Sequence, residues 1–258
     1  MDFLKMAWIS FKGQRAAFRL DEFLLLETGY PFLTLVFHCV LAAYAYGTGN
    51  IIDWIVGNAF LLCTHLCVFS LGNSFTGERY FGRIRSIITG KKSKIRIILE
   101  KGFFPGICSV ITTFTGFLAG CLCFQISLDG LPFMKLLLVF LISMFAAMGF
   151  GCFLSIFGLI SNQMHFLLNT VEYVLLIFTG SNFPVSQLPE PVRIVSNLLP
   201  FTRGIEAARQ IMSGESMRSV AFLLAGELAV GAVYLLAAAV LIQFAEKAAI
   251  RQGTFDLF

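Results

Sequence analysis

The sequence has few charged residues for its length. Only 13% of its 258 residues are Asp, Glu, Lys or Arg, whereas soluble domains carry about a quarter. Hydrophobic residues make up 57%, there are 29 phenylalanines, and the mean hydropathy is +0.82. This balance excludes an ordinary soluble domain and indicates a membrane protein.

The sequence also lacks the motifs of common catalytic sites. Its three histidines are scattered over separate hydrophobic stretches, and neither an H-E-x-x-H nor a serine-elbow pattern occurs. The stretch SIITGKKSKI (86–95) resembles the end of a phosphate-binding loop, G-x-x-x-x-G-K-[ST], but Arg85 replaces the first glycine and Lys92 the final Ser or Thr. We therefore expect no catalytic residue, no nucleotide site and no cofactor bound by this chain.

The seven cysteines show no metal-binding pattern. All of them fall in hydrophobic stretches, and zinc sites need further ligands at closer loop spacings. We expect small apolar side chains packed in a helix bundle and no metal site.

Six hydrophobic stretches approach the ~20 residues that a helix needs to cross a bilayer. They cover 26–47, 51–75, 103–124, 131–160, 164–179, which is short, and 220–244. We therefore predict an all-α membrane protein with six transmembrane helices, forming one transmembrane domain over 1–258. In the third stretch, Gly116 and Gly120 form a small-xxx-small pattern, which predicts a close approach of two helices.

The basic residues are distributed unevenly along the chain. With six spans, both termini and the segments after spans two and four share one side, and that side holds 14 of the 19 Lys and Arg residues. By the positive-inside rule this side is cytoplasmic. We expect a multi-pass protein of the inner membrane, with both termini cytoplasmic, in contact with membrane lipid and without a nucleic-acid partner.

Two segments outside the spans have helical character. Residues 3–20 gather apolar side chains on one face and basic ones elsewhere, which predicts an amphipathic helix at the membrane interface. The alternative is a short soluble helix packed on a partner. Residues 181–217 hold four prolines between apolar runs, which predicts short helices cut at the prolines. They are too short to span and too apolar for a free loop, so we predict a re-entrant hairpin in the outer leaflet.

Two glutamates lie inside predicted spans, Glu172 in the fifth and Glu227 in the sixth. A carboxylate at that depth costs about 2.5–3.5 kcal/mol, so it should face the bundle interior or a wet cavity. Glu172, with Asn169, either lines a substrate path, carries a proton or hydrogen-bonds neighbouring helices. For Glu227 the hydrogen-bonding role is favoured.

The segment after the second span combines basic and apolar residues. It predicts either a short cytoplasmic helix that offers apolar side chains to a partner, or a loop that binds anionic lipid headgroups. Its sequence, GERYFGRIRSIITGKKSKIRIILEKG (77–102), resembles the E-R-x-x-G-T-L-E-x-L-L-x-T-P and following G-K of the permease subunit of type-2 ATP-binding-cassette exporters. Arg83 and Arg85 replace the threonine and glutamate of that pattern, and Gly90-Lys91 replaces its threonine-proline.

A second stretch carries the same resemblance more specifically. FTGSNFPVSQLPEPVRIVSNLLPFTRGIEAARQI (178–211) is similar to the family's S-G-x-x-F-P-x-S-x-L-P…L-P-x-T-x-x-I-E-A-x-R. The order of the parts along the whole chain also fits that family.

The resemblance implies a half-transporter. Two permease chains would pair, as a homodimer or a heterodimer, and two copies of a separate ABC ATPase subunit would bind ATP and Mg²⁺. The cytoplasmic coupling loop (76–102) would contact the ATPase through Glu78, Arg79, Gly82, Arg83, Ile84, Arg85, Ile87 and Ile88. The substrate pathway or outer gate would include Asn169, Glu172, Tyr173, Phe183, Pro184, Glu206 and Arg209.

The expected activity is therefore the outward transport of an amphiphile, such as a drug, a lipid-linked molecule or a peptide. An ATP-independent carrier or channel that uses an intramembrane glutamate is the alternative.

Overall fold

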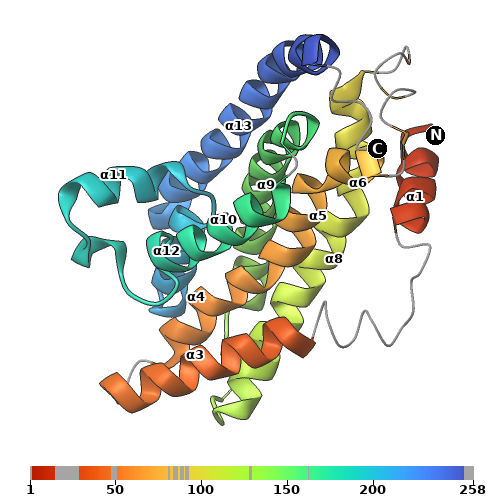
Figure 1. Cartoon of the computed structure of the whole chain (residues 1–258). Helices are drawn as coiled ribbons and strands as arrows, with labels where there is room; N and C mark the ends of the chain where they lie inside the picture. The colour runs from red at the N-terminus through yellow and green to blue at the C-terminus, as the bar shows by residue number, and fades with distance from the viewer. Residues whose placement is uncertain are drawn as a thin grey trace.

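The computed structural model describes residues 2–14, 29–47, 51–80, 82–83, 87, 90, 93–127, 130–161 and 163–252. Within these ranges every regular element is a helix and no strand occurs. Figure 1 shows a bundle of long helices with α1 (Asp2–Gln14) and α6 (Ser74–Tyr80) at one end. The helices α11 (Glu190–Leu198) and α12 (Thr202–Met212) lie at the opposite end. The all-α class is thus confirmed for the described part of the chain.

Four of the predicted spans are helices long and apolar enough to cross a membrane. The first of these combines α4 (Ile51–Cys63), the π-helical turn η2 (Thr64–Phe69) and α5 (Ser70–Gly72). The others are α8 (Lys94–Cys123), α9 (Phe133–Ser155) with its 3₁₀ extension η3 (Ile156–Leu159), and the Met217–Phe244 part of α13 (Met217–Gln252).

The first and fifth predicted spans correspond to shorter helices. α3 (Tyr30–Tyr46) has 17 residues and α10 (Met164–Phe178) has 15. At 1.5 Å per residue each is about 25 Å long or less, below the ~30 Å hydrocarbon core of a bilayer. A six-span topology therefore stays a prediction.

The helix of the third predicted span, α8, begins nine residues before the predicted start at 103, because it includes Lys94 and the following basic residues. The predicted coupling loop is therefore helical at both ends, in α6 and in the first turns of α8. Hydropathy alone ends a span at charged residues. Here the helix continues because Ile98, Glu100 and Lys101 are buried against the bundle.

Glycines allow the long helices to pack closely. A Cβ atom at Gly116 would overlap the side chain of Leu62 on α4, and one at Gly120 would lie 2.8 Å from Ile55. The predicted close approach at this small-xxx-small pattern is confirmed. A Cβ at Gly149 of α9 would likewise lie 2.5 Å from the carbonyl oxygen of Gly231 on α13.

The N-terminal helix packs on α8 through aromatic rings. Phe3 meets Phe103 edge-on at 5.6 Å, and Trp8 meets Phe104 at 5.1 Å. Trp8 is still 44% exposed, so apolar surface remains on the outer side of α1. The described helix ends at Gln14, and residues 15–20 lie outside the described part. The position of α1 at the membrane interface stays a prediction.

The prolines between α10 and α13 divide that segment into short helices, as predicted. Pro184 precedes the 3₁₀ turn η4 (Val185–Gln187), Pro189 precedes α11, and Pro200 lies between α11 and α12. Proline lacks a backbone N–H and disfavours the helical conformation of the residue before it, which explains these breaks. Whether the hairpin enters the outer leaflet stays a prediction.

Candidate functional site

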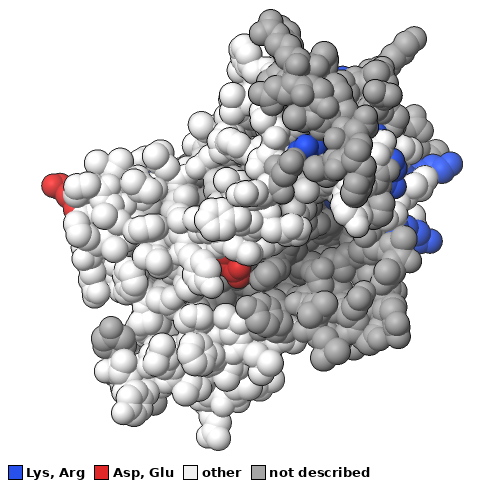
Figure 2. All heavy atoms as spheres, viewed as in Figure 1, with Lys and Arg blue, Asp and Glu red and all other residues white. Residues whose placement is uncertain are grey.

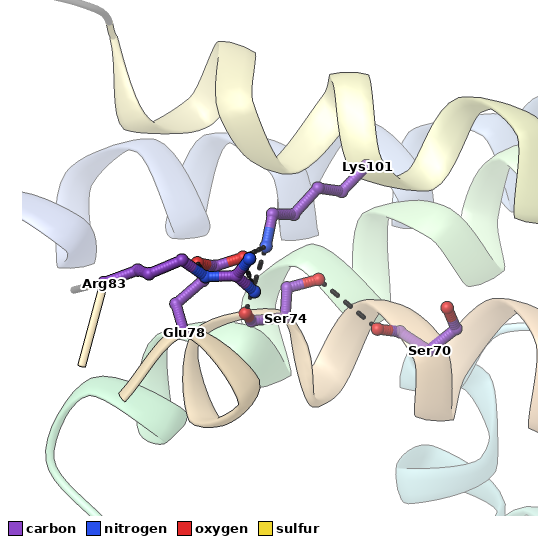
Figure 3. A network of polar contacts seen from close by, with 5 residues as sticks. All are labelled: Ser70, Ser74, Glu78, Arg83 and Lys101. Atoms are coloured by element: carbon purple, nitrogen blue, oxygen red, sulfur yellow. Dashed lines mark hydrogen bonds and ion pairs between the residues drawn. The ribbon is translucent and has the colours of Figure 1, made fainter. Parts of the chain in front are cut away.

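Glu78 is the centre of a polar cluster that joins α6 to α8 (Figure 3). The Nζ of Lys101 lies 2.5 Å from Glu78 Oε1, and the Nε of Arg83 lies 2.9 Å from Glu78 Oε2. Lys101 also donates to the Ser74 carbonyl oxygen at 3.3 Å. The side chains of Glu78 and Lys101 are only 12% and 8% exposed, whereas Arg83 is 55% exposed. We call Ser74, Glu78, Arg83 and Lys101 the Glu78 cluster.

Arg79, the next residue on α6, joins this helix to the end of α9. Its Nη1 donates to the carbonyl oxygens of Gly158 at 3.2 Å and Ser161 at 3.0 Å. These carbonyls lie at the end of η3, where a helix has no partner of its own for them. Burial lowers the pKa of Arg79, but an arginine keeps its charge at neutral pH. Thr76 packs so closely here that a Cβ at Gly158 would lie 2.7 Å from its Oγ1.

The predicted ATPase-contact residues thus have different surroundings. Arg79 is 3% exposed and is used within the chain. Gly82, with φ +65°, and Arg83 are exposed, and Ile87 is partly buried against the core. Ile84, Arg85 and Ile88 lie outside the described residues. In the face shown in Figure 2, Lys and Arg gather at the end where α1 and α6 lie.

The predicted pathway residue Glu172 lines a cavity of about 60 Å³ between α3, α4–η2 and α10. Tyr173 lines the same cavity and is 65% exposed. Asn169, about one turn earlier on α10, is exposed and is not among the lining residues. The remaining walls come from Thr34, Leu35, His38, Asn58, Leu61, Leu62, Thr64 and Leu176.

Four polar residues of this cavity were missed as pathway residues by the sequence analysis: Thr34, His38, Asn58 and Thr64. His38 places its Nδ1 2.8 Å from the Thr34 carbonyl oxygen. Asn58 donates from Nδ2 to the Trp54 carbonyl oxygen at 3.0 Å and to Asn182 Oδ1 at 3.1 Å. Thr64 is 1% exposed. A polar residue inside a predicted span was the available signal, but sequence does not show that helices α3, α4 and α10 converge.

At the opposite end, Arg209 fastens α12 to two other segments. Its Nη2 donates to the Ser181 carbonyl oxygen at 3.0 Å and to the Asp53 carbonyl oxygen at 3.2 Å. Burial lowers the pKa of Arg209, while the Asp53 and Glu206 carboxylates raise it. Glu206 accepts a hydrogen bond from Gln210 Nε2 at 2.9 Å.

A polar basin of about 790 Å³ lies beside this contact, and Pro184, Glu206 and Arg209 are among its lining residues. The structure therefore brings these three predicted gate residues together. Phe183 is half-buried and is not among the residues that line the basin.

The corner between α11 and α12 depends on Glu227 of α13. Phe201 adopts φ +75°, is fully buried, and donates its backbone N–H to Glu227 Oε1 at 2.6 Å. Thr202 Oγ1 donates to the Ser196 carbonyl oxygen at 2.6 Å across the same corner. Glu227 is itself fully buried, so the favoured hydrogen-bonding role of this glutamate is confirmed.

The chain was compared with models of protein families. A family model described as "ABC-2 family transporter protein" matches residues 38–240. The matched range includes the Glu78 cluster, the cavity beside Glu172 and the hairpin of α11 and α12. No curated protein matches the chain.

Proposed function

Because the chain belongs to the ABC-2 family of transporter proteins, we propose that it is the permease subunit of an ATP-driven exporter. A separate ABC ATPase, present in two copies, binds and hydrolyses ATP with Mg²⁺. A second permease chain, identical or related, completes the pathway. The family assignment does not support the alternative of an ATP-independent carrier.

The way α6 is anchored carries this proposal. A surface helix passes on the motion of a partner only if its own connections to the transmembrane helices are stiff. The Glu78 cluster joins α6 to α8, and Arg79 joins it to the end of η3. Charge-assisted contacts of this kind are short and directional, and they are strong where water is excluded. Movement of α6 would therefore be passed to two long helices together.

The exposed part of this region would meet the ATPase. Arg83 reaches the surface while one of its nitrogens holds Glu78, and the neighbouring Gly82 and Tyr80 are also exposed. Arg85, Ile84 and Ile88 are assigned to the same contact from the family resemblance. Arg79 and Glu78 act from below this surface as positioning residues.

The transport pathway in this proposal follows α3, α4 and α10, and the α11–α12 hairpin acts as its outer gate. The cavity beside Glu172 and the basin beside Arg209 support this path. With six spans, the coupling region and both termini are cytoplasmic and the hairpin faces outward. The substrate is an amphiphile.

The coupling role is tested with the double variant Arg83→Glu, Arg85→Glu, co-expressed with the ATPase and reconstituted in vesicles. Like charges placed against a complementary surface cost several kcal/mol, and each 1.4 kcal/mol is a factor of ten. We expect substrate moved per ATP hydrolysed to fall about tenfold or more.

The control is Lys135→Glu with Arg218→Glu, which makes the same change in charge at two exposed positions outside the coupling region. This variant should copurify with the ATPase and couple as the unmodified chain does. Normal assembly and normal coupling in the Arg83, Arg85 variant would refute the docking role.

A further inference from the structure

The segment that follows α10 lies directly on α4. A Cβ atom at Gly57 of α4 would overlap the carbonyl oxygen of Ser181, so the two backbones are in contact there. The next residue of α4, Asn58, donates from Nδ2 to Asn182 Oδ1 at 3.1 Å. Ser181 is fully buried. We call Ser181 and Asn182 the crossing segment, because the chain crosses α4 at this point.

The crossing segment lies between two hollows of the molecule. Asp53, near the start of α4, lines the polar basin, whereas Asn58 and Leu61 line the cavity beside Glu172. Asp53 and Asn58 are five residues apart, which is about 7.5 Å along a helix. The crossing segment contacts α4 within this interval and at its end. A passage along α4 from the cavity to the basin therefore requires the crossing segment to leave the helix.

Arg209 of α12 fastens the crossing segment to α4. Its Nη2 donates to the carbonyl oxygens of Ser181 at 3.0 Å and Asp53 at 3.2 Å, and its Nε donates to the Asp53 oxygen at 3.3 Å. One planar guanidinium thus joins three segments of the chain. Its donors form a rigid fork, whereas a lysine would offer a single compact ammonium group. The crossing segment cannot leave α4 unless these bonds break.

The guanidinium also has a second partner close by. The carboxylates of Asp53 and Glu206 act on its charge and raise the pKa of Arg209, yet in the described part of the chain its bonds go to backbone carbonyls. Glu206 precedes Arg209 by three residues on α12, a spacing that places two side chains on one helix face. At present it accepts a hydrogen bond from Gln210. If α12 moved away from α4, the Asp53 carbonyl would stay behind and Glu206 would move with the arginine.

We propose that Arg209 is a two-position latch at the outer end of the pathway. In the closed position it holds α12 and the crossing segment on α4, and the cavity is separated from the basin. In the open position it pairs with Glu206 and the crossing segment leaves α4. Arginine keeps its charge in both positions, so one set of charge-assisted bonds replaces another. The inference rests on the proposed function, because it takes the α11–α12 hairpin to be the outer gate.

The test measures how fast a water-soluble reagent reaches the cavity, without the ATPase. Leu61→Cys, at a partly buried residue of the cavity wall, is introduced into the full chain with Cys123→Ser. The protein is placed in phosphatidylcholine nanodiscs and reacted with a permanently charged methanethiosulfonate, which lipid excludes. Mass spectrometry follows the reaction. The Cys123→Ser chain without Leu61→Cys gives the reaction of the remaining cysteines, which is subtracted.

The latch predicts opposite effects at its two residues. Arg209→Gln removes the charged donor that holds the closed position, so the reaction should be about 10- to 100-fold faster. Arg209→Lys should lie between this variant and the unmodified latch. Glu206→Gln removes the partner of the open position, so the reaction should be about twofold slower. Because Glu206 acts through the arginine, the double variant should react as Arg209→Gln does. A contribution to stability alone would not produce this pattern.

Arg218→Gln is the matched control, at an exposed residue that does not line the basin, and it should leave the rate unchanged. Elution volume and thermal unfolding establish that each variant is folded. If Arg209→Gln is misfolded, Arg209→Lys and Asn182→Ala decide the result. Asn182→Ala removes the other bond of the crossing segment to α4, and both variants should accelerate the reaction about threefold or more.

The outcomes separate this latch from the proposed function. An unchanged rate in folded Arg209→Gln overturns the latch, and so does a reaction in the unmodified latch that is already as fast as in this variant. A faster reaction in Glu206→Gln would assign Glu206 to the closed position and overturn the exchange of partners. The expected rates beside normal coupling of the Arg83, Arg85 variant would refute the docking role alone.

Discussion

Lys101 is buried where α6 meets α8, in surroundings that penalise an unpaired ammonium group by several kcal/mol. Its contacts with Glu78 and with the Ser74 carbonyl offset that penalty. Arg83 holds the other oxygen of the same carboxylate, so Glu78 is shared by a buried and an exposed cation. Removing one member of such a group costs more than the group contributes as a whole, because a buried charge is left behind.

We predict a large coupling energy between Glu78 and Lys101. Glu78→Gln and Lys101→Met should each lower the free energy of unfolding by about 3–5 kcal/mol. The double variant should lose less than their sum, by about 1–3 kcal/mol. The measurement is a four-protein cycle by denaturant titration in mixed micelles. Arg96 and Glu100, an i,i+4 pair in which Arg96 is 48% exposed, form the control cycle, with a coupling of about 0.5 kcal/mol or less. Additive effects at Glu78 and Lys101 would contradict the cluster's role.

Sequence alone identified some of these residues but not their partners. Glu78 and Arg79 were assigned to the ATPase contact by resemblance, yet Arg79 is buried against Gly158 and Ser161. Its hydrogen bonds join residues about 80 positions apart, and no local pattern encodes that distance. The same limit hid Thr64 and His38, which line one cavity only because the fold brings α3 and η2 to it.

The α11–α12 hairpin is the element whose geometry depends most visibly on one distant side chain. A left-handed conformation at a non-glycine residue costs about 1–2 kcal/mol, and Phe201 adopts it at φ +75°. Burial of the Phe201 ring beside Phe60 and the bond to Glu227 offset this strain. Glu227 therefore fixes where α12 begins, and with it the position of Arg209.

We predict that loss of the Glu227 carboxyl group loosens this corner. In Glu227→Ala the buried Phe201 N–H lacks its acceptor, at a cost of about 1–3 kcal/mol, so amide exchange over 199–206 should accelerate about tenfold or more. Glu227→Gln keeps an acceptor oxygen and should stay near the unmodified rate. Hydrogen exchange followed by mass spectrometry in nanodiscs measures this. Glu215→Ala, at an exposed residue, is the control, and unchanged exchange in Glu227→Ala would show that the corner does not depend on this contact.

Among the helices, those whose bounds depend on nearby residue types were predicted well from the sequence. Prolines marked the breaks around η4, α11 and α12, and apolar length marked the four long helices. The early start of α8 and the π-helical turn η2 were not predicted. Both depend on tertiary packing: burial stabilises charged residues at the start of α8, and no residue type within 64–69 specifies a π turn.

Charged side chains lie at both ends of the bundle: basic ones gather near α1 and α6 (Figure 2), and a mixed set that includes Asp53, Glu206 and Arg209 surrounds the basin at the opposite end. The face shown in Figure 2 is otherwise largely uncharged. The 30 residues of α8 give it a length of about 45 Å, more than the ~30 Å hydrocarbon core. If α8 crosses the membrane, its basic start and its end at Cys123 lie on opposite sides.

The proposed orientation predicts from which side of the membrane a water-soluble reagent can reach each end of the bundle. Cys123 is exposed and most other described cysteines are buried, so it is a natural probe of the outer side. The matching cytoplasmic probe is Tyr80→Cys, at a 64% exposed residue of α6, in a Cys123→Ser background. Tyr80 is preferable to Arg83 for this purpose because basic residues themselves determine orientation. A membrane-impermeant maleimide should modify Cys123 of the unmodified chain in intact cells, and the thiol introduced by Tyr80→Cys only in inverted vesicles.

The Cys123→Ser chain without a new cysteine is the control. In intact cells and in inverted vesicles it measures the labelling of the remaining cysteines, including any reaction of the half-buried Cys108. Modification of the Tyr80→Cys chain in intact cells, with Cys123 reached only in inverted vesicles, would mean that the basic end faces outward. The ATPase could then not dock on α6, and the proposed function would fail with the topology. Modification of both positions from the same side would show that α8 does not cross the membrane. The expected pattern would place the Glu78 cluster where a cytoplasmic ATPase can move it and the α11–α12 hairpin where an exported molecule leaves.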